Sequence, residues 1–292
     1  MADKSKDMDF GAECSGSVAG TVMLFTDASL KAEVEWLEPS DVGLIGTQKP
    51  GRGGRQIAKK DVRGDVSLEA SYAHMNAILQ QCFDEAAGTF TPADSPEDLA
   101  IDVVLNRKVQ IYTYADCWLN ELELSASENE AIAVRLGLLG KDEEKAGAVG
   151  ALVLPDRMRM ADLSVAIGAD NYFPTRFAWM WTYDLVERFH NSIIRSHVMA
   201  RIPKCTLELD LDQNSDTYAD LYAKAGTNSP VDDVVLTLTD GVNTVTITMP
   251  EMTVMNASEP QDISGIEEIT GTVELRAWLD DAESDILEIA YA

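Results

Sequence analysis

The stretch Gly64-Asp-Val-Ser-Leu-Glu-Ala-Ser-Tyr-Ala-His-Met-Asn-Ala-Ile-Leu-Gln-Gln-Cys-Phe, residues 64–83, decides how the chain is organised. Residues 66–71 alternate between apolar and polar side chains, which indicates a strand. From Tyr72 to Ala87 the apolar residues recur at helical spacing, and Gly88 follows as a typical helix stop. One helical face then carries Met75, Ile78, Leu79, Cys82 and Phe83. The stretch predicts a strand, a helix and a glycine stop.

The same order returns in the second half of the chain. Thr206-Leu-Glu-Leu-Asp-Leu alternates as a strand, and residues 215–225 carry apolar side chains at helical spacing before Gly226. Hairpins are predicted at residues 102–114 and 233–249, because each range holds two apolar runs around a turn. An alternating strand closes each half, at residues 134–138 and 273–278. An internal duplication explains this repetition.

The repeat predicts a mainly β protein of two tandem β-sandwich or barrel domains, each with one flanking α-helix. Each half opens with a long two-stranded element, at residues 18–36 and 162–187. The charged and then small-residue stretch at 141–150 suits a linker, so we place the boundary near Gly147. The predicted domains are residues 1–146 and 147–292.

The charge of the chain is strongly uneven. The formal net charge is −27, from 50 acidic and 23 basic residues, which opposes binding to nucleic-acid phosphates and anionic lipid. Two equivalent segments, residues 49–63 and 188–204, are basic within this acidic chain. Such polarity favours self-association, and we predict contacts to a neighbouring ring or subunit. The contact candidates are Lys49, Arg52, Arg55, Lys59, Lys60, Arg63, Arg188, Arg195, Arg201 and Lys204.

Taken together, the repeated order of hairpin, long loop around Pro50-Gly-Arg-Gly-Gly-Arg, strand, helix and further strands resembles the tail tube proteins of long-tailed bacteriophages, in a tandem two-domain form. The resemblance implies a structural subunit whose rings stack into a tube for DNA passage. A tandem chain would form a homotrimer with pseudo-sixfold symmetry. The implied partners are further copies of the chain, terminator, tape measure and distal tail proteins, and DNA that passes without specific binding. The implied location is the virion tail, assembled in the host cytoplasm.

Within such a tube we expect a negative lumen, lined by acids that alternate with apolar residues on the strands. The lumen candidates are Glu69, Glu121, Glu123, Glu208, Asp210, Asp212 and Glu274. Their neighbours Leu68, Leu122, Leu207, Leu209 and Leu275 would face the core. A solvated outer face is the alternative for these acids.

Residue patterns for catalysis, cofactors or metals are weak, so we predict a non-enzymatic protein without a cofactor. His74 lies on the predicted helix, where a partly buried structural role is expected. Asp210, Asp212, Asn214 and Asp216 begin like a calcium loop, but Ser215 and Leu221 stand at its glycine and glutamate positions. The four cysteines have no CxxC spacing and are expected to be buried thiols.

Some alternatives stay open. Phe177, Trp179, Trp181 and Tyr183 lie on one strand face, either as core or as a subunit interface. A distal tail or baseplate hub protein, a β-sandwich binding or adhesin module, and a hydrolase using paired carboxylates remain alternative functions. The first residues hold no apolar signal segment and no apolar run reaches a membrane span, so neither secretion nor membrane insertion is expected.

Overall fold

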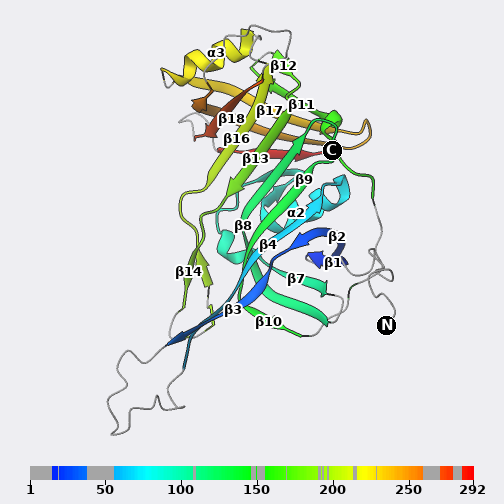
Figure 1. Ribbon diagram of the computed structural model, residues 1–292, viewed down its shortest axis with the longest axis vertical. Helices are drawn as coiled ribbons and strands as arrows, with labels where there is room; N and C mark the ends of the chain where they lie inside the picture. Colours follow the sequence, from blue (N-terminus) through cyan, green and yellow to red (C-terminus); the bar gives the residue numbers. More distant parts are fainter. Residues whose placement is uncertain are drawn as a thin grey trace, which may run out of the picture.

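The computed structural model of the chain is built mainly of β-strands, and within its described residues one α-helix lies in each half. Described are residues 15–18, 20–37, 56–107, 110–145, 149, 155–168, 170–189, 192, 194–195, 197–212, 216–227, 229–258, 270–278 and 285–292. Figure 1 shows an elongated molecule, in which the elements before β11 (Leu163–Ile167) form the lower part and most later elements form the upper part.

Six strands of the lower part close into a barrel. In order around the barrel they are β1 (Ser15–Val18), β2 (Thr21–Ala28), β4 (Gln56–Glu69), β9 (Ala133–Gly140), β8 (Gln110–Ser127) and β7 (Ala100–Arg107). Each strand is antiparallel to the next, and β7 pairs back onto β1. Alternate residues such as Leu122, Leu124 and Leu136 are fully buried, which turns one face of every strand toward the core.

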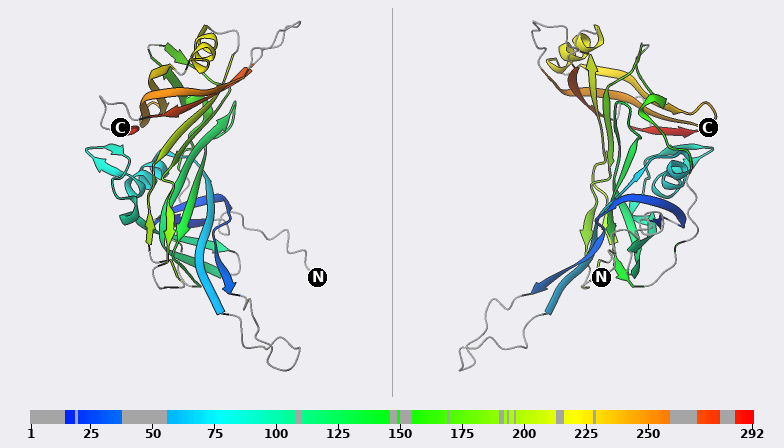
Figure 2. Two further views of the ribbon diagram at one scale, coloured as in Figure 1. Left: turned by 90° about the vertical axis from the view of Figure 1, so that its left-hand side faces the viewer. Right: turned by 45° about the vertical axis from the view of Figure 1, so that its right-hand side comes forward.

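The N-terminal part of β4 continues beyond the barrel and pairs with β3 (Lys31–Leu37). We call residues 31–37 and 56–63 the arm; Figure 2 shows it projecting from the body. The crossing from barrel to arm depends on Gly64, whose φ is +144°. A Cβ at Gly64 would lie 2.7 Å from the backbone of Ser29 and Leu30, so a side chain has no room there.

The upper part is a single antiparallel sheet. Its strands are, in order, β12 (Asp170–Tyr172), β11, β17 (Pro230–Thr239), β18 (Thr244–Ala257), β19 (Thr270–Ala277), β16 (Lys204–Asp212) and β13 (Arg176–Thr182). The helix α3 (Asp216–Ala225) packs against this sheet through Tyr218, whose ring lies over Gly271. Since a Cβ at Gly271 would lie 2.4 Å from that ring, the glycine lets the helix approach the sheet.

The strand pairings of the two parts follow the same order. The ladders β4–β9, β9–β8, β8–β7 and β7–β1 have counterparts in β16–β19, β19–β18, β18–β17 and β17–β11. In both parts the helix follows the first strand of this series, and Leu68 faces Val134 as Leu209 faces Val273. This agreement supports our proposal of two duplicated domains. The proposed boundary near Gly147 lies outside the described residues.

The two parts share a sheet, because β13 of the upper part pairs along its seven residues with β8 of the barrel. The ladder runs from Arg176 opposite Ser127 to Thr182 opposite Glu121. β4, β9, β8, β13, β16 and β19 therefore form one continuous surface, which we call the shared sheet. A second joint lies near the C-terminus, where β20 (Glu288–Tyr291) pairs with both β18 and β6 (Thr89–Thr91).

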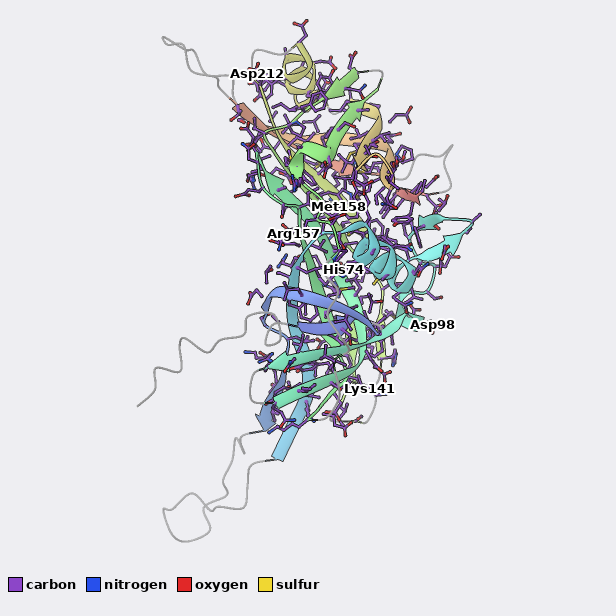
Figure 3. The ribbon with its side chains drawn as sticks, turned by 90° about the vertical axis from the view of Figure 1, so that its right-hand side faces the viewer. His74, Asp98, Lys141, Arg157, Met158 and Asp212 are labelled. Carbon is purple, nitrogen blue, oxygen red and sulfur yellow. The ribbon has the colours of Figure 1, made fainter. Side chains whose placement is uncertain are left out.

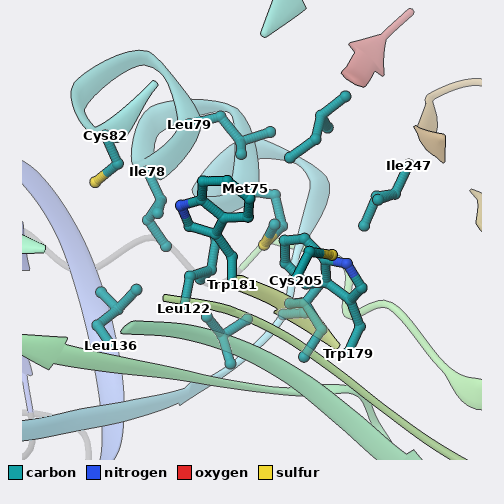
Figure 4. Packing of buried hydrophobic residues seen from close by; sticks show 14 of the residues in the cluster. Met75, Ile78, Leu79, Cys82, Leu122, Leu136, Trp179, Trp181, Cys205 and Ile247 are labelled. Atoms are coloured by element: carbon teal, nitrogen blue, oxygen red, sulfur yellow. The ribbon is translucent and has the colours of Figure 1, made fainter. Parts of the chain in front are cut away.

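The aromatic side chains of β13 and of Tyr183, the residue after it, fill the core between the two parts. Phe177, Trp179 and Trp181 are fully buried and Tyr183 is 3% exposed. Trp181 lies close to the helix α2 (Tyr72–Cys82) and to Leu122, as Figure 4 shows. The Tyr183 hydroxyl donates a 2.8 Å hydrogen bond to the Cys82 carbonyl. These aromatics are thus core within one chain, which answers the question that the sequence left open.

The helix in the lower part is shorter than predicted. Its buried face, Met75, Ile78, Leu79 and Cys82, is confirmed, but the helix ends at Cys82. Residues 84–86 form β5 (Asp84–Ala86), and Gly88 serves the β5–β6 turn with a φ of +85°. The prediction of a helix to Ala87 was wrong because pairing with β6, itself held by β20, outweighs local helix propensity.

Three of the four cysteines, Cys82, Cys117 and Cys205, are free and buried, which confirms the prediction for these residues; Cys14 lies outside the described residues. None of the helices in the described part of the chain is long and apolar enough to cross a membrane.

Because the two parts share a sheet and a core, we predict that the chain unfolds in one transition. Trp181→Ala should lower the free energy of unfolding of the whole chain by about 3–5 kcal/mol, through lost burial and a cavity. Urea unfolding followed by far-ultraviolet circular dichroism and by fluorescence measures this. Tyr222→Ala, at a side chain 37% exposed, is the control and should change stability by less than about 1 kcal/mol. Two separate transitions, of which the variant moves one, would contradict the prediction.

Candidate functional site

The shared sheet has one face on the core and one face toward solvent, and we call the solvent side the polar face. Strand alternation places all seven acids predicted for the lumen on this polar face, while their leucine neighbours are at most 1% exposed. The acids are Glu69, Glu121, Glu123, Glu208, Asp210, Asp212 and Glu274. The buried leucines Leu68, Leu122, Leu207, Leu209 and Leu275 confirm the predicted side-chain alternation.

Strand register brings acids from distant parts of the sequence together. Glu208 on β16 lies directly opposite Glu274 on β19. Glu123 on β8 lies between Arg135 on β9 and Met180 on β13. A shallow hollow on this face is lined by Glu123, Arg176, Met180, Thr206, Glu208 and Glu274. The polar face is therefore a continuous acidic surface that spans both halves.

Three arginines, which the sequence analysis did not single out, hold these acids in place. Arg135 contacts Glu121, Glu123 at 2.9 Å and Asp65 at 3.7 Å. Arg176 pairs with Glu208 at 3.0 Å, and Arg157 pairs with Glu69 at 2.8 Å. Burial opposes the charge of Arg135, but its hydrogen bond to Glu123 and the nearby carboxylates prevail and raise its pKa. The alternation Val134-Arg135-Leu136 was the sequence signal for the first of them.

Glu274 differs from the other acids on this face. No ion pair to Glu274 exists among the described residues, and its side chain faces Glu208 across the strand pair. Two carboxylates side by side produce a locally negative field that the neighbouring arginines offset only in part. The polar face thus remains negative at the centre of the upper part.

The second basic segment does not project from the chain. Residues 184–203 connect β13 to β16. The described residues of this connection lie beside the barrel, where β14 (Val186–Arg188) pairs with β15 (His197–Met199), as the position of β14 in Figure 1 shows. We call residues 184–203 the strap. Arg195 of the strap is fully buried, and its guanidinium donates to the carbonyls of Val62, at 3.1 Å, and Gly140.

Arg195 also contacts two carboxylates, Asp61 at 3.2 Å and Glu187 at 2.6 Å. Lys59 and Arg63 on the arm approach the same pair, with Lys59 2.8 Å and Arg63 2.7 Å from Glu187. We call these five residues the ion cluster. Burial opposes ionisation of Asp61, yet hydrogen bonds from Arg63 and Lys59 outweigh it and hold the pKa of Asp61 below its ordinary value.

The two basic segments therefore meet inside one chain, and this corrects part of the predicted contact set. Arg195 is interior, and Lys59, Lys60 and Arg63 belong to strand β4 rather than to a loop. Lys60 pairs with Asp142, and Lys204 lies on the polar face near Asp184. Arg188 and Arg201 are exposed. Lys49, Arg52 and Arg55 lie outside the described residues.

The residues that the sequence offered for catalysis or metal binding make contacts typical of a structural role. Within the described residues no group of three His, Cys, Asp or Glu side chains is arranged to hold a metal ion. Asp210, from the calcium-like run, accepts a hydrogen bond from the Thr272 hydroxyl at 2.6 Å. His74 is 8% exposed and burial lowers its pKa. Figure 3 shows His74 near Arg157; a small hollow there is lined by Glu69, Ser71, His74 and Arg157 among others.

A closed barrel joined edge to edge to a second sheet, with one continuous charged face, defines a class of structural β-proteins. A family model described as "Phage tail tube protein" matches residues 10–182, which is more than half of the chain. The chain belongs to the phage tail tube protein family. The match ends at Thr182, the last residue of β13, so it includes the strand that joins the two parts. A search among curated proteins gave no match.

We predict that the strap depends on Arg195. Arg195→Ala should lower the free energy of unfolding by about 3–5 kcal/mol, because it leaves Asp61 and Glu187 without their buried cation. Urea unfolding measures this loss. Arg201→Ala, at an exposed cation of the same strap, is the matched control and should change stability by less than about 0.5 kcal/mol. Equal small effects of both variants would show that the ion cluster does not hold the strap.

Proposed function

We propose that three copies of this chain close into a ring of six equivalent halves, and that such rings stack into the tail tube around a channel for DNA. The observation that carries the proposal is the β13–β8 joint, which continues the sheet from one half to the next. The same joint, repeated between copies, generates a closed ring. Two fused halves reduce the number of chains in a six-unit ring to three.

Open strand edges suited to this repetition exist on both sides of the chain. β17 covers one side of β18 only up to Thr253, so Val254–Ala257 have no strand on that side among the described residues. The corresponding stretch of β8, beyond the part covered by β7, receives β13. At the other end of the shared sheet, β3 pairs only with β4 in the part that the structure describes. Unpaired edges are templates for addition of a strand from another copy.

The polar face lines the channel in this proposal. When the shared sheet continues around the ring, one of its faces turns inward, and the core, α2 and α3 occupy the other side. The inward face carries Glu121, Glu123, Glu208 and Glu274, and a negative wall repels DNA phosphates. DNA then finds few sites at which to bind and slides. The arginines on the face keep the carboxylates ordered without reversing the sign of the surface.

Assembly with other tail proteins follows from the same role. A tube of stacked rings needs proteins that start, measure and end it, so we propose distal tail, tape measure and terminator proteins as further partners. The subunit would be assembled in the host cytoplasm into the virion tail. The proposed role is structural, and no enzymatic step belongs to it.

We predict that the purified chain, with its tail partners or at high concentration, assembles in units of three. Native mass spectrometry should give a trimer, and negative-stain microscopy should give rings or tubes with a central hole. The backbone N–H of Ser258 donates to Thr272 on β19, so the N–H of its neighbour Ala257 points to the open edge of β18. Ala257→Pro should therefore leave the fold intact and prevent assembly, because proline removes a backbone donor from that edge. Thr244→Pro, at the paired beginning of β18, is the contrasting variant and should destabilise the fold itself. A chain that stays monomeric under all these conditions would refute the ring.

We predict that the sign of the polar face controls DNA mobility in assembled tubes. Glu208→Lys together with Glu274→Lys should leave tubes intact but make them retain short DNA duplexes at low salt, since counter-charges then hold the phosphates. Retention of labelled duplex measures this. Glu85→Lys together with Asp94→Lys is the matched control. Glu85 lies on β5 and Asp94 lies just before the short helix η1 (Pro96–Asp98), and both side chains are exposed away from the polar face. Equal retention by both double variants would place the polar face outside the channel.

A further inference from the structure

The strap covers one particular place on the lower part of the molecule. Beyond the end of the β4–β9 ladder at Val62 and Gly140, strap residue Ile194 forms a parallel bridge with Lys60. Arg195 then reaches Asp61, which is only 3% exposed. The strap therefore occupies the slot beside β4 that β9 leaves open.

In the part of the chain that the structure describes, no strand or strap covers the corresponding place on the upper part. The two ladders can be aligned residue by residue, with Leu68 matched to Leu209 and Val134 matched to Val273. Counted along the strands from there, Ile202 is the counterpart of Asp61 and Trp278 is the counterpart of Leu139. Ile202 is 77% exposed and Trp278 is 42% exposed, although both are large apolar side chains. Met199, which precedes Ile202 on the strap, is 45% exposed. Apolar side chains gathered at one place mark an interaction surface.

Cations surround this apolar place. Arg201 and Lys204 flank Ile202 in the sequence and are both exposed. The Arg276 guanidinium lies 4.4 Å from the centre of the Trp278 ring. We call Arg201, Ile202, Lys204, Arg276 and Trp278 the bare site. Its chemistry predicts an occupant that offers acidic and apolar side chains in alternation.

The arm of another copy offers this chemistry. The arm and the strap are counterparts by their position in the chain. The arm lies between β2 and the barrel part of β4, and the strap lies between β13 and β16. β3 in the arm reads Lys31-Ala-Glu-Val-Glu-Trp-Leu, in which Glu33 and Glu35 are exposed and Val34 is 40% exposed. On the lower part, a cation of the strap meets an acid of β4. At the bare site the charges are reversed, because the cations belong to the site and the acids belong to the arm.

We propose that the arm of one copy docks through β3 on the bare site of the next copy in the ring, in the slot that the strap occupies within a chain. Glu33 and Glu35 meet Arg201 and Lys204, and Val34 covers Ile202. This inference rests on the proposed function, because it requires a ring of copies. It assigns the arm to the contact between neighbouring copies in one ring. Docking removes the exposed surface of Ile202 and Trp278 from water and so enlarges that contact.

Reversal of charge on each side tests the proposal. Glu33→Lys with Glu35→Lys, and separately Arg201→Glu with Lys204→Glu, should each raise the concentration for half-assembly at least about tenfold, because like charges then face each other. The chain with all four substitutions should recover to within about threefold of the original. Sedimentation velocity measures assembly, and circular dichroism verifies the fold of each variant. Glu85→Lys with Asp94→Lys raises the net charge as much as the arm variant does and should leave assembly unchanged, while the chain with all four substitutions keeps the original net charge.

A disulfide trap supplies a second readout. Val34→Cys and Ile202→Cys chains, mixed under mild oxidation, should give a cross-linked species that contains one of each, whereas neither chain alone should do so. If the original chain assembles and the charge-reversed chains assemble equally well, arm docking is refuted while the ring stands. If the original chain never assembles, the ring and the docking both fail.

Discussion

The backbone pairing of β13 with β8 is the constraint on which the rest of the structure depends. It fixes the register between the two halves, and a slip of one residue would turn Trp179 and Trp181 from the core to the polar face. The buried aromatics stabilise the register and the register orients the aromatics, so neither half has a complete core without the other. This mutual dependence is why we expect the chain to fold as one cooperative unit although its strand order is repeated.

The charges follow from that sheet. Because alternate residues face opposite sides, a shared sheet with an apolar core produces one long polar surface, and acids from β4, β8, β16 and β19 accumulate there. Carboxylates at this density repel one another, and arginines such as Arg135 and Arg176 relieve the repulsion locally. The strap solves a different problem at the edge, where Arg195 satisfies the carbonyls of Val62 and Gly140 as the β4–β9 ladder ends.

Local patterns in the sequence predicted the elements that periodicity defines. The strands at 66–69 and 206–211, the β7–β8 and β17–β18 hairpins, the helix face from Met75 to Cys82 and the acids opposite the leucines are all confirmed. Features that depend on long-range contacts were missed. The strand β5 was missed because its residues favour a helix unless β6 pairs with them. The ion cluster was missed because Asp61 and Arg195 are distant in sequence. Registers and tertiary partners have no local signal, so Arg195 looked like a surface cation.

In the duplicated chain and the ring that we propose, the contact within a chain and the contact between copies face different demands. The joint inside the chain never meets water after folding, so β13 can carry Phe177, Trp179 and Trp181 on one face. A contact between copies must stay soluble before assembly, and an equally aromatic edge would aggregate. The outer contact therefore favours apolar residues with charges between them, as in β3, and the net charge of −27 adds repulsion between free subunits. In this proposal the two halves differ because only the joint between copies has to exist both free and assembled, whereas the joint within the chain is always closed.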